Sequence, residues 1–312
     1  MPRQVNNYMI QPQINVQLAS HTTFGIGGPA DFFVVAGTPD ELFEAVSWAK
    51  EKNLPFFILG SGANILIGDK GFRGLVIKNE ASSFSIRANK ENKNTLLVVQ
   101  SGALIADIIH VTLEKGLSGF EHFAGIPSTV GGALWQNLHF LSPDRTKTVY
   151  IADIVTSAEI ISISENSLEK KEVDHSYFNF SYDYSTLHNT HDVVLSASFE
   201  LQQKSFEDIG RVMHANVLWR QERHPKDAAK KSAGSIFKRI EGFGSGRLIE
   251  QVGLKGKRIG GAEISETHAN FILNVDHATA KDVRLLIDLI QQTVKEKLDL
   301  TMQPEISFIG EF

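Results

Sequence analysis

Two short apolar runs separated by a glycine-rich turn constrain the fold of this chain more than any other feature. The runs are residues 57–59 and 65–67, and the turn between them consists of Gly60, Ser61, Gly62, Ala63 and Asn64. Glycine has no Cβ, so such a turn lets backbone N–H groups approach an anion closely. A Rossmann fingerprint has a third glycine and continues into a helix. Because aliphatic residues follow here, the pattern predicts strand, turn and strand, either as a phosphate-binding turn or as a hairpin without a ligand.

A second glycine cluster lies farther along the chain, within an otherwise apolar region. It combines glycines, a proline and hydroxyl side chains in Gly125, Ile126, Pro127, Ser128, Thr129, Val130, Gly131, Gly132 and Ala133. Such a segment offers free backbone donors and small side chains, which suit a pyrophosphate or the face of a flat ring. Two loops of this kind on one β-rich unit favour a bound nucleotide cofactor.

Composition limits the class of protein. The chain has 312 residues, of which 42% are hydrophobic and 21% charged, as expected for one large globular domain or a few small ones. The net charge of −5 gives no reason to expect nucleic acid or an anionic membrane as a partner. No apolar run approaches the roughly 20 residues of a membrane span, and residues 1–4 do not begin a signal-peptide core. Cysteine is absent, which excludes disulfides and cysteinyl-flavin links and agrees with a reducing cytoplasm.

The histidines predict no metal site. There are eleven of them, but His110, His122 and His139 have neither HxxxH nor HxH spacing, and His224 and His268 are isolated. Each is better explained as a surface residue or a hydrogen-bonded core residue than as a metal ligand. The first glycine turn also contains no histidine that could carry a covalent flavin.

Hydrophobic periodicity predicts helices alternating with strands. A capping box that starts at Thr38 opens a helix to about residue 53, and further helices are predicted at 104–115, 206–217 and 279–298, the last capped by Thr279. The stripe expected to face the core in the third of these helices is Phe206, Ile209, Val212, Met213 and Val217. Strands are predicted at 55–59, 95–100, 149–164, 192–201 and 306–309, with the last a candidate to return to an earlier domain.

The glycine loops and a series of further motifs resemble the UDP-N-acetylenolpyruvoylglucosamine reductase (UDP-N-acetylmuramate dehydrogenase, MurB) family. The motifs follow the family order along nearly the whole chain, so the set is specific although no single motif is decisive. They occupy residues 23–31, 60–64, 119–137, 232–238, 248–250, 253–256, 268–274 and 304–305.

The resemblance implies an α+β chain, with an FAD-binding fold of the vanillyl-alcohol oxidase/p-cresol methylhydroxylase type plus a C-terminal α+β substrate domain. It implies FAD-binding subdomains at 1–78 and 79–203 and a substrate-binding domain at 204–312. FAD would be bound non-covalently, with NADPH as the hydride donor. The cofactor residues implied are those of the turn at 60–64, the second cluster except Val130, and the following Gln136 and Asn137.

Ser235 is the first candidate for chemistry. It lies beside Gly234 and follows a basic segment that contains Arg223, His224, Lys226, Lys230 and Lys231. The glycine lets the hydroxyl project into a site, and the cations could hold a diphosphate. A solvated basic loop with a turn serine is the alternative. By the resemblance, Ser235 matches the serine that protonates the substrate carbon, and Arg223 lies near the phosphate-binding cation.

Glu305 is the second catalytic candidate. It follows Pro304 at the start of an apolar strand, where a carboxylate usually marks only the exposed face. The resemblance places this glutamate in the active site, beside the enolpyruvyl group of the substrate. Tyr182, Lys238 and Asn270 are further candidates for substrate contact.

The chain departs from the family at two places. The family carries a Tyr-Arg-x-Ser motif whose arginine helps to hold the substrate carboxylate or the enolic intermediate, but residues 182–185 read Tyr-Asp-Tyr-Ser. The family's Asn-Ala-Gly-Ala-Tyr-Gly run is also changed, and residues 137–140 read Asn-Leu-His-Phe. A negative charge opposes enolate formation. Either Arg145 or Arg223 therefore takes over, or Asp183 points elsewhere, or activity is altered.

The resemblance implies a cytoplasmic reductase of peptidoglycan precursor synthesis that uses NADPH and FAD to convert UDP-GlcNAc-enolpyruvate to UDP-N-acetylmuramate. The implied partners are small molecules, without nucleic acid or membrane. One alternative is another FAD oxidoreductase of the same fold, which would not need the basic segment at 223–238. The other is a non-catalytic flavin- or UDP-sugar-binding paralogue, suggested by Asp183.

Overall fold

The structure is a computed structural model that describes residues 10–88, 94–165, 167–225, 231–240 and 242–312. Its contacts divide the chain into two units, each made of several segments. Unit 1 comprises Met1–Ile14, Phe32–Gly60 and Gly74–Val217, and unit 2 comprises Asn15–Asp31, Ser61–Arg73 and Leu218–Phe312. Local patterns cannot show that a chain leaves a unit and returns to it, so the three continuous domains remain a prediction.

The main sheet of unit 1 is antiparallel and has the strand order β12-β11-β13-β7-β6, with β8 paired to β13 beside it. Its strands are β6 (Phe84–Ala88), β7 (Thr95–Gln100), β8 (Leu117–Ser118), β11 (Val155–Ile163), β12 (Leu168–Asp174) and β13 (Val193–Gln203). The strands predicted at 95–100 and 192–201 are confirmed. The one predicted at 149–164 is divided between β10 (Thr148–Tyr150) and β11.

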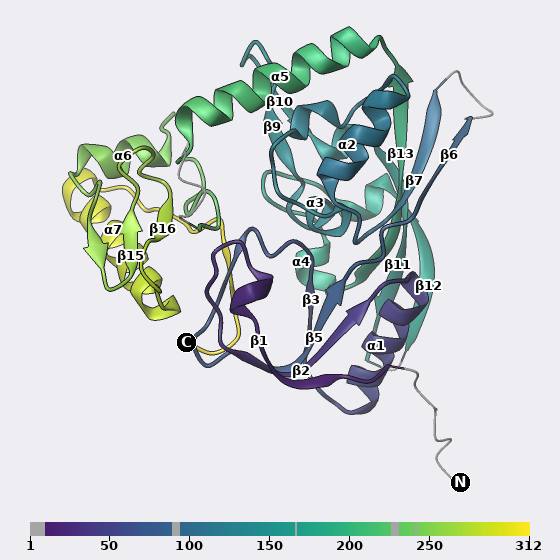
Figure 1. The fold of residues 1–312 in the computed structure, drawn as a ribbon, viewed down its shortest axis with the longest axis horizontal. Coiled ribbons are helices and arrows are strands. Elements are labelled where there is room, and N and C mark those ends of the chain that lie inside the picture. Colours follow the sequence, from purple (N-terminus) through teal and green to yellow (C-terminus); the bar gives the residue numbers. More distant parts are fainter. Residues whose placement is uncertain (1–9, 89–93, 166, 226–230, 241) are drawn as a thin grey trace. The chain divides into compact units, whose positions relative to one another are not determined.

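Two helices pack on this sheet (Figure 1). They are α2 (Ile105–Glu114) and α3 (Val130–Gln136). The apolar residues of α2 recur at helical spacing, and Ile105, Ile108 and Ile109 are buried together with Leu97 and Val99 of β7. The helix predicted at 104–115 is therefore confirmed, and its apolar face provides the core of this part of unit 1.

A second sheet contains the strands around helix α1. Its order is β1-β2-β5-β3, with β3 and β5 parallel, and its strands are β1 (Gln13–Gln17), β2 (Pro29–Ala36), β3 (Phe56–Leu59) and β5 (Phe72–Asn79). Helix α1 (Pro39–Glu51) is capped by Thr38, whose Oγ1 accepts from the Glu41 N–H at 3.2 Å. The Glu41 carboxylate accepts from the Gly37 N–H at 2.7 Å, so the return contact of the predicted capping box lies one residue earlier than expected.

Unit 2 contains a short antiparallel sheet with two helices. The strands, in the order β14-β15-β16, are β14 (Arg258–Ile259), β15 (Ala262–Ile264) and β16 (Ile272–Asn274), and the helices are α6 (Ser245–Gln251) and α7 (Ala280–Leu298). Thr279 and Asp282 form both contacts of a capping box, which confirms the predicted start of α7. The apolar stripe of α7 is buried in the core of the unit, at Val283, Leu286, Ile287, Ile290 and Val294.

The end of the chain returns to an early segment within unit 2. Strand β17 (Ser307–Ile309) pairs in parallel with β4 (Ile65–Ile67), and Phe308 lies opposite Leu66. The predicted strand at 306–309 thus pairs with an early segment, and its return to an earlier domain remains a prediction. Because β4 follows the first glycine turn directly, this pairing also brings Glu305 towards that turn.

Helix α5 (Phe206–Arg223) has a less apolar face than predicted. Ile209 is buried, but Phe206 is 63% exposed, so its assignment to the core is wrong. Phe206 is the first residue of the helix and extends beyond the buried face. The remaining elements of the described residues are β9 (His139–Leu141), which pairs with β10, the helix α4 (Leu187–Thr190), and short 3₁₀ helices at Ala19–His21, Glu121–Phe123, Ile151–Asp153 and His175–Phe178. Across the residues that the structure describes, no helix has the length and apolar character needed to cross a membrane.

Candidate functional site

The two predicted cofactor loops meet in unit 1 at Gly60 and Thr129. A Cβ added at Gly60 would lie 2.5 Å from Thr129 Oγ1, closer than a real side chain allows. Glycine therefore lets the end of β3 approach the residue that caps α3. The structure thus brings Gly60, the first residue of the first loop, against Thr129 of the second loop.

The backbone donors at the start of α3 are largely used within the protein. The N–H of Val130 donates to the Ala103 carbonyl at 2.9 Å, and the N–H of Gly131 donates to the Ser101 carbonyl at 2.7 Å. The N–H of Gly132 donates to Thr129 Oγ1 at 3.3 Å. The expectation of free donors is therefore wrong at these three residues, because the loop folds back onto its own unit. The assignment of Gly131 and Gly132 to the cofactor site remains a prediction.

Lys78 adds a positive charge beside the first loop. Its ammonium donates a hydrogen bond to the Gly60 carbonyl oxygen at 2.5 Å. Burial lowers the pKa of Lys78, and the negative charge of Glu80 opposes that shift. A cation and two adjoining glycine turns fit the pyrophosphate of FAD, which is a dianion. Lys78 is not identifiable from the sequence, because a single lysine in an apolar strand forms no recognisable motif.

Buried polar groups without partners gather where α3 ends. Asn137 Oδ1 and both carboxylate oxygens of Asp183 have no hydrogen-bond partner among the described residues, although Asn137 Nδ2 donates to the Ser181 carbonyl at 2.9 Å. Asn137 and Asp183 also have positive φ angles, of 50° and 52°. Asn and Asp adopt this conformation more readily than other residues with a side chain, and Asn137 uses it to end α3. The unsatisfied buried polar groups are the feature that calls for an explanation.

His139 lies against Asp183. Its Nδ1 atom is 3.8 Å from Asp183 Oδ1 and 3.3 Å from the Asn137 carbonyl oxygen. The imidazole ring packs between Tyr150 and Tyr182, with centroid distances of 5.3 Å and 4.9 Å. Tyr182, the predicted substrate residue, is 42% exposed. The two places where the sequence departs from the family pattern are therefore in contact, which their separation along the chain does not reveal.

Arg145 is engaged in holding α5. Its guanidinium donates to Asn216 Oδ1 at 2.8 Å and to the Ala215 carbonyl at 3.2 Å. It also lies 5.7 Å from the centroid of the Phe140 ring. These contacts direct the group towards the protein, so Arg145 is a poor replacement for an arginine that binds substrate.

In unit 2, residues 61–64 are joined to the motif at 23–31. Gly62 has a φ of +66°, and a Cβ there would lie 2.4 Å from the His21 carbonyl oxygen. The Gly62 carbonyl accepts from the Thr23 N–H at 3.1 Å, and Thr23 Oγ1 donates to the Ser232 carbonyl at 2.8 Å. The first loop is thereby linked to the segment that leads to Ser235.

The predicted catalytic residues Ser235 and Glu305 lie on neighbouring segments of unit 2. Ser235 forms a β-bridge with Phe271, and the next carbonyl, of Ile236, accepts from the Glu305 N–H at 2.8 Å. Asn64 Nδ2 in turn donates to the Glu305 carbonyl at 3.3 Å. The structure therefore brings both residues together beside the first loop, although no contact here assigns their roles.

Asn270 and Lys238 are next to this pair, but the Asn270 amide serves the fold. Its Oδ1 atom accepts from the Phe237 N–H at 3.0 Å, and its Nδ2 atom donates to the Phe237 carbonyl at 2.9 Å. Asn270 is only 6% exposed. The Lys238 N–H donates to the Gln303 carbonyl at 2.9 Å, which fixes the backbone beside Glu305. Their contact with substrate remains a prediction.

His224 and His268, which are isolated in the sequence, contact each other in the structure. Their ring centroids are 5.9 Å apart, and the ring of Phe271 lies 4.9 Å from His224 and 5.0 Å from His268. Burial, with the charges of Arg220 and His268, lowers the pKa of His224 to about 3, and burial also lowers the pKa of His268. Both rings are therefore neutral packing groups near Ser235. Spacing in the sequence gives no signal of this contact.

Arg223 lies at the surface of unit 2. Its guanidinium is 2.8 Å from Glu222 Oε2 and 4.8 Å from the centroid of the Trp219 ring, with 47% of the side chain exposed. This placement favours a solvated ion pair over a buried substrate contact. Of the other predicted cations, Lys226 and Lys230 lie outside the described residues.

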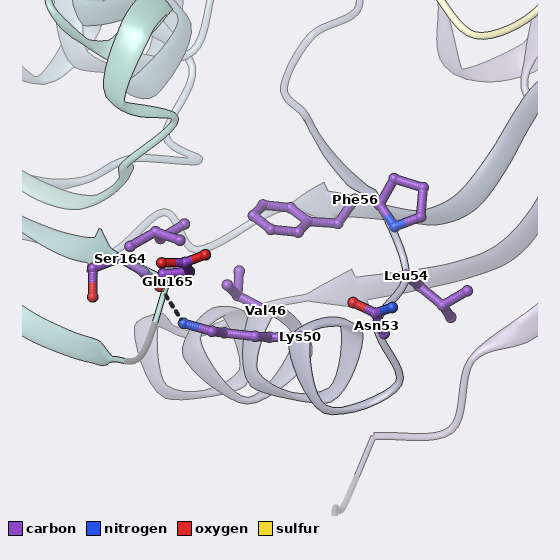
Figure 2. A pocket seen from close by; sticks show the side chains of 9 residues that line it. Val46, Lys50, Asn53, Leu54, Phe56, Ser164 and Glu165 are labelled. Carbon is purple, nitrogen blue, oxygen red and sulfur yellow. Dashed lines mark hydrogen bonds between the residues drawn. The ribbon is translucent and has the colours of Figure 1, made fainter.

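A separate cavity of about 310 Å³ lies in unit 1 beside the C-terminal part of α1 (Figure 2). Lys50 projects across it and donates to the Ser164 carbonyl at 2.5 Å. Its lining residues are Val46, Lys50, Asn53, Leu54, Pro55, Phe56, Ile163, Ser164 and Glu165, none of which is a predicted site residue.

Within the described ranges, no group of three or more histidine, aspartate or glutamate side chains could hold a metal ion.

Comparison with known proteins places these features in a family. Residues 30–165 match the family model of the FAD binding domain, and residues 224–309 match that of the UDP-N-acetylenolpyruvoylglucosamine reductase C-terminal domain. These matches confirm the predicted fold class, an FAD-binding fold followed by a C-terminal domain.

Relatives match along nearly the whole chain. The UDP-N-acetylenolpyruvoylglucosamine reductase of Caldanaerobacter subterraneus subsp. tengcongensis is 39% identical over 298 residues, which are 96% of this chain and 93% of the relative. UDP-N-acetylenolpyruvoylglucosamine reductase 2 of Bacillus cereus is 36% identical over 94% of this chain and 91% of its own. The crystal structure of the reductase (MurB) from Thermus caldophilus matches with a TM-score of 0.75 and 30% identity, over 96% of this chain and 99% of that one.

Proposed function

Because this chain belongs to the UDP-N-acetylenolpyruvoylglucosamine reductase family, we propose that it reduces UDP-GlcNAc-enolpyruvate to UDP-N-acetylmuramate with NADPH. The observation that carries the proposal is the ordered match of both domains to this family over 96% of the chain. A different FAD oxidoreductase would not be expected to match the C-terminal domain model at residues 224–309.

FAD, when bound, carries the hydride from NADPH to the substrate. The residues proposed to hold it in unit 1 are those around Gly60 and Thr129, with Lys78 adding a positive charge near the pyrophosphate. The loop continues through Gly62, whose carbonyl is fixed by Thr23. Binding energy at these residues orients the cofactor and leaves the chemistry to other side chains.

Ser235 and Glu305 are proposed to act on the enolpyruvyl group. Hydride addition at the β-carbon moves the electron pair of the double bond onto the α-carbon and its carboxylate. The Ser235 hydroxyl then supplies the proton that the α-carbon takes up, and Glu305 stabilises the intermediate from the neighbouring segment. The β-bridge of Ser235 and the backbone bond of Glu305 support the proposal, because they hold the two residues on adjoining, regular segments.

We place this reaction in the cytoplasm, within peptidoglycan precursor synthesis, with the UDP-sugar and NADPH as its small-molecule partners. Neither nucleic acid nor a membrane is part of this proposal. The net charge of −5 supports that view.

Absorbance of the purified protein tests the proposed function. A yellow protein that releases FAD on denaturation, is bleached by anaerobic NADPH and recovers its colour with UDP-GlcNAc-enolpyruvate is the expected result. Bleaching without recovery would reject the substrate and favour another flavin oxidoreductase. Binding of FAD and UDP-sugar without either colour change would indicate a non-catalytic paralogue.

A further inference from the structure

Asp183 carries a buried carboxylate whose only ion-pair partner, within the residues described, is His139. The side chain is 1% exposed, and neither oxygen accepts a hydrogen bond. A buried carboxylate in this condition is strongly destabilising unless a positive charge lies near it. The 3.8 Å separation from His139 Nδ1 supplies that charge when the imidazole is protonated. His139 is therefore the side chain that can compensate the Asp183 carboxylate, and its ring lies 4.9 Å from that of Tyr182, a predicted substrate residue.

The surroundings of His139 fix which ring nitrogen faces the protein. Nδ1 lies near two acceptors, the Asn137 carbonyl oxygen at 3.3 Å and Asp183 Oδ1 at 3.8 Å, so it carries a hydrogen. The rings of Tyr150 and Tyr182 limit rotation of the imidazole. Nε2 is then the nitrogen left for a ligand, on a side chain that is 22% exposed. A buried carboxylate behind a partly exposed imidazole is a general way to orient a histidine.

The two arginines that could serve instead are occupied. Arg145 is bonded to Asn216 and to the backbone of α5. Arg223 forms a surface ion pair with Glu222 and lies over Trp219. Neither arginine lies beside an unsatisfied buried carboxylate, whereas His139 lies beside that of Asp183.

We propose that His139, held by Asp183 through Nδ1–H, donates from Nε2–H to the carboxylate of the substrate and, with a hydrogen on both nitrogens, stands in for the cation that the departure at residue 183 removes. His139 is a substrate-binding residue in this view, and Asp183 is a positioning residue that acts through it. No bond to His139 forms or breaks. Its charge offsets the negative charge that develops on the substrate carboxylate as hydride adds to the adjoining double bond. The inference rests on the proposed function.

Separate half-reactions test the proposal in the FAD-loaded protein. In His139→Gln, reoxidation of the bleached protein by UDP-GlcNAc-enolpyruvate should slow about 100-fold, as for loss of one charge-stabilising donor. In Asp183→Asn it should slow about 10-fold, because the donor remains but is less well oriented. Bleaching by NADPH should be unchanged in both. His110→Gln, on an exposed position of α2, is the matched control and should behave as wild type.

Nitrogen NMR of histidine-labelled protein provides a readout that does not need turnover. The His139 signal, assigned by its loss in His139→Gln, should show hydrogens on both Nδ1 and Nε2 when the substrate is bound, and should shift in Asp183→Asn, while the His110 signal stays. A bare Nε2 in that complex would overturn the substrate contact, and a bare Nδ1 would overturn the orientation by Asp183. Wild-type reoxidation in His139→Gln would overturn the substrate contact while leaving the proposed function intact. A wild-type protein that is bleached but never reoxidised by the substrate would reject the function and this role together. If Asp183→Asn does not fold, His139→Gln decides the outcome.

Discussion

Asn270 in unit 2, a predicted substrate residue, and Asp183 in unit 1, at a departure from the family motif, are both buried polar residues, but their surroundings differ completely. The Asn270 amide forms two hydrogen bonds with the main chain of Phe237. The Asp183 carboxylate forms none and has one histidine 3.8 Å away. Equal burial therefore does not mean equal roles. The Asn270 amide satisfies main-chain groups of the fold, whereas burial of the Asp183 carboxylate without such bonds costs free energy.

The same contrast extends to the two regions around these residues. In the region of Ser235 and Glu305, where the chain keeps the family motifs, backbone bonds between neighbouring segments hold the candidate groups. In the region of Asn137 and Asp183, where the chain departs from the motifs, φ is positive and polar atoms lack partners. The first region is expected to resemble its relatives in mechanism. The second region is expected to contain the contacts in which this chain differs from its relatives.

The largest effect is expected from Ser235→Ala, which tests the region of unit 2. Loss of a positioned proton donor typically slows a reaction by about 10²–10⁴-fold. Reoxidation of the flavin by the substrate should fall by that amount, with FAD content and bleaching by NADPH unchanged, since the serine has no role in reducing the flavin. Stopped-flow absorbance measures the two steps separately. Unaltered reoxidation would show that Ser235 is not the proton donor. The region of Ser235 and Glu305 would then no longer be the one that carries the reaction.

Asn270→Ala should give the second largest effect, on stability. The change removes both hydrogen bonds to Phe237 and leaves its N–H and carbonyl buried without partners, at a cost of about 2–3 kcal/mol. Urea unfolding followed by circular dichroism measures the loss. A variant as stable as the wild type would show that the amide does not hold this region, and the comparison with Asp183 would lose its basis.

His224→Phe should change the response to acid in unit 2. The pKa of His224 is lowered to about 3 in the folded state, below its ordinary value. Between about pH 6.5 and 3 the unfolded state therefore binds a proton that the folded state does not, so stability is lost as the pH falls. Phenylalanine keeps an aromatic contact with Phe271 and has no proton to bind. The variant should lose less stability than the wild type between pH 7 and 4, and urea midpoints at the two pH values measure the difference.

Parallel acid losses in the two proteins would contradict a neutral, buried His224. Measurements at pH 8, where neither state protonates the imidazole, control for any change in packing.

Asp183→Asn should give the smallest effect on stability, in contrast to Asn270→Ala. There is no hydrogen bond to lose, and a neutral amide replaces a buried charge, so the free energy of unfolding should stay within about 1 kcal/mol of the wild type or rise. The same urea experiment measures it. Unchanged stability with slower reoxidation would separate a positioning role from a structural one. A loss as large as that of Asn270→Ala would show that Asp183 serves the fold.

The sequence by itself determined the local structure and the family. Helical spacing predicted α2 and α7, and the capping residue Thr279 was recognisable because its partner Asp282 is only three residues away. The ordered motifs indicated the FAD-binding fold and the C-terminal domain, which the family models confirm. These features depend on residues a few positions apart or on the order of motifs along the sequence, and both can be read directly from the chain.

Only the tertiary structure decided which distant residues meet. Lys78 lies against Gly60, His224 against His268, and His139 against Asp183. None of these contacts leaves a periodic pattern, because each depends on the path of the chain through a unit that other segments interrupt. The same holds for burial. The sequence contains an aspartate where the resemblance implies an arginine, but the removal of its carboxylate from water, with one histidine beside it, is a property of the packed fold.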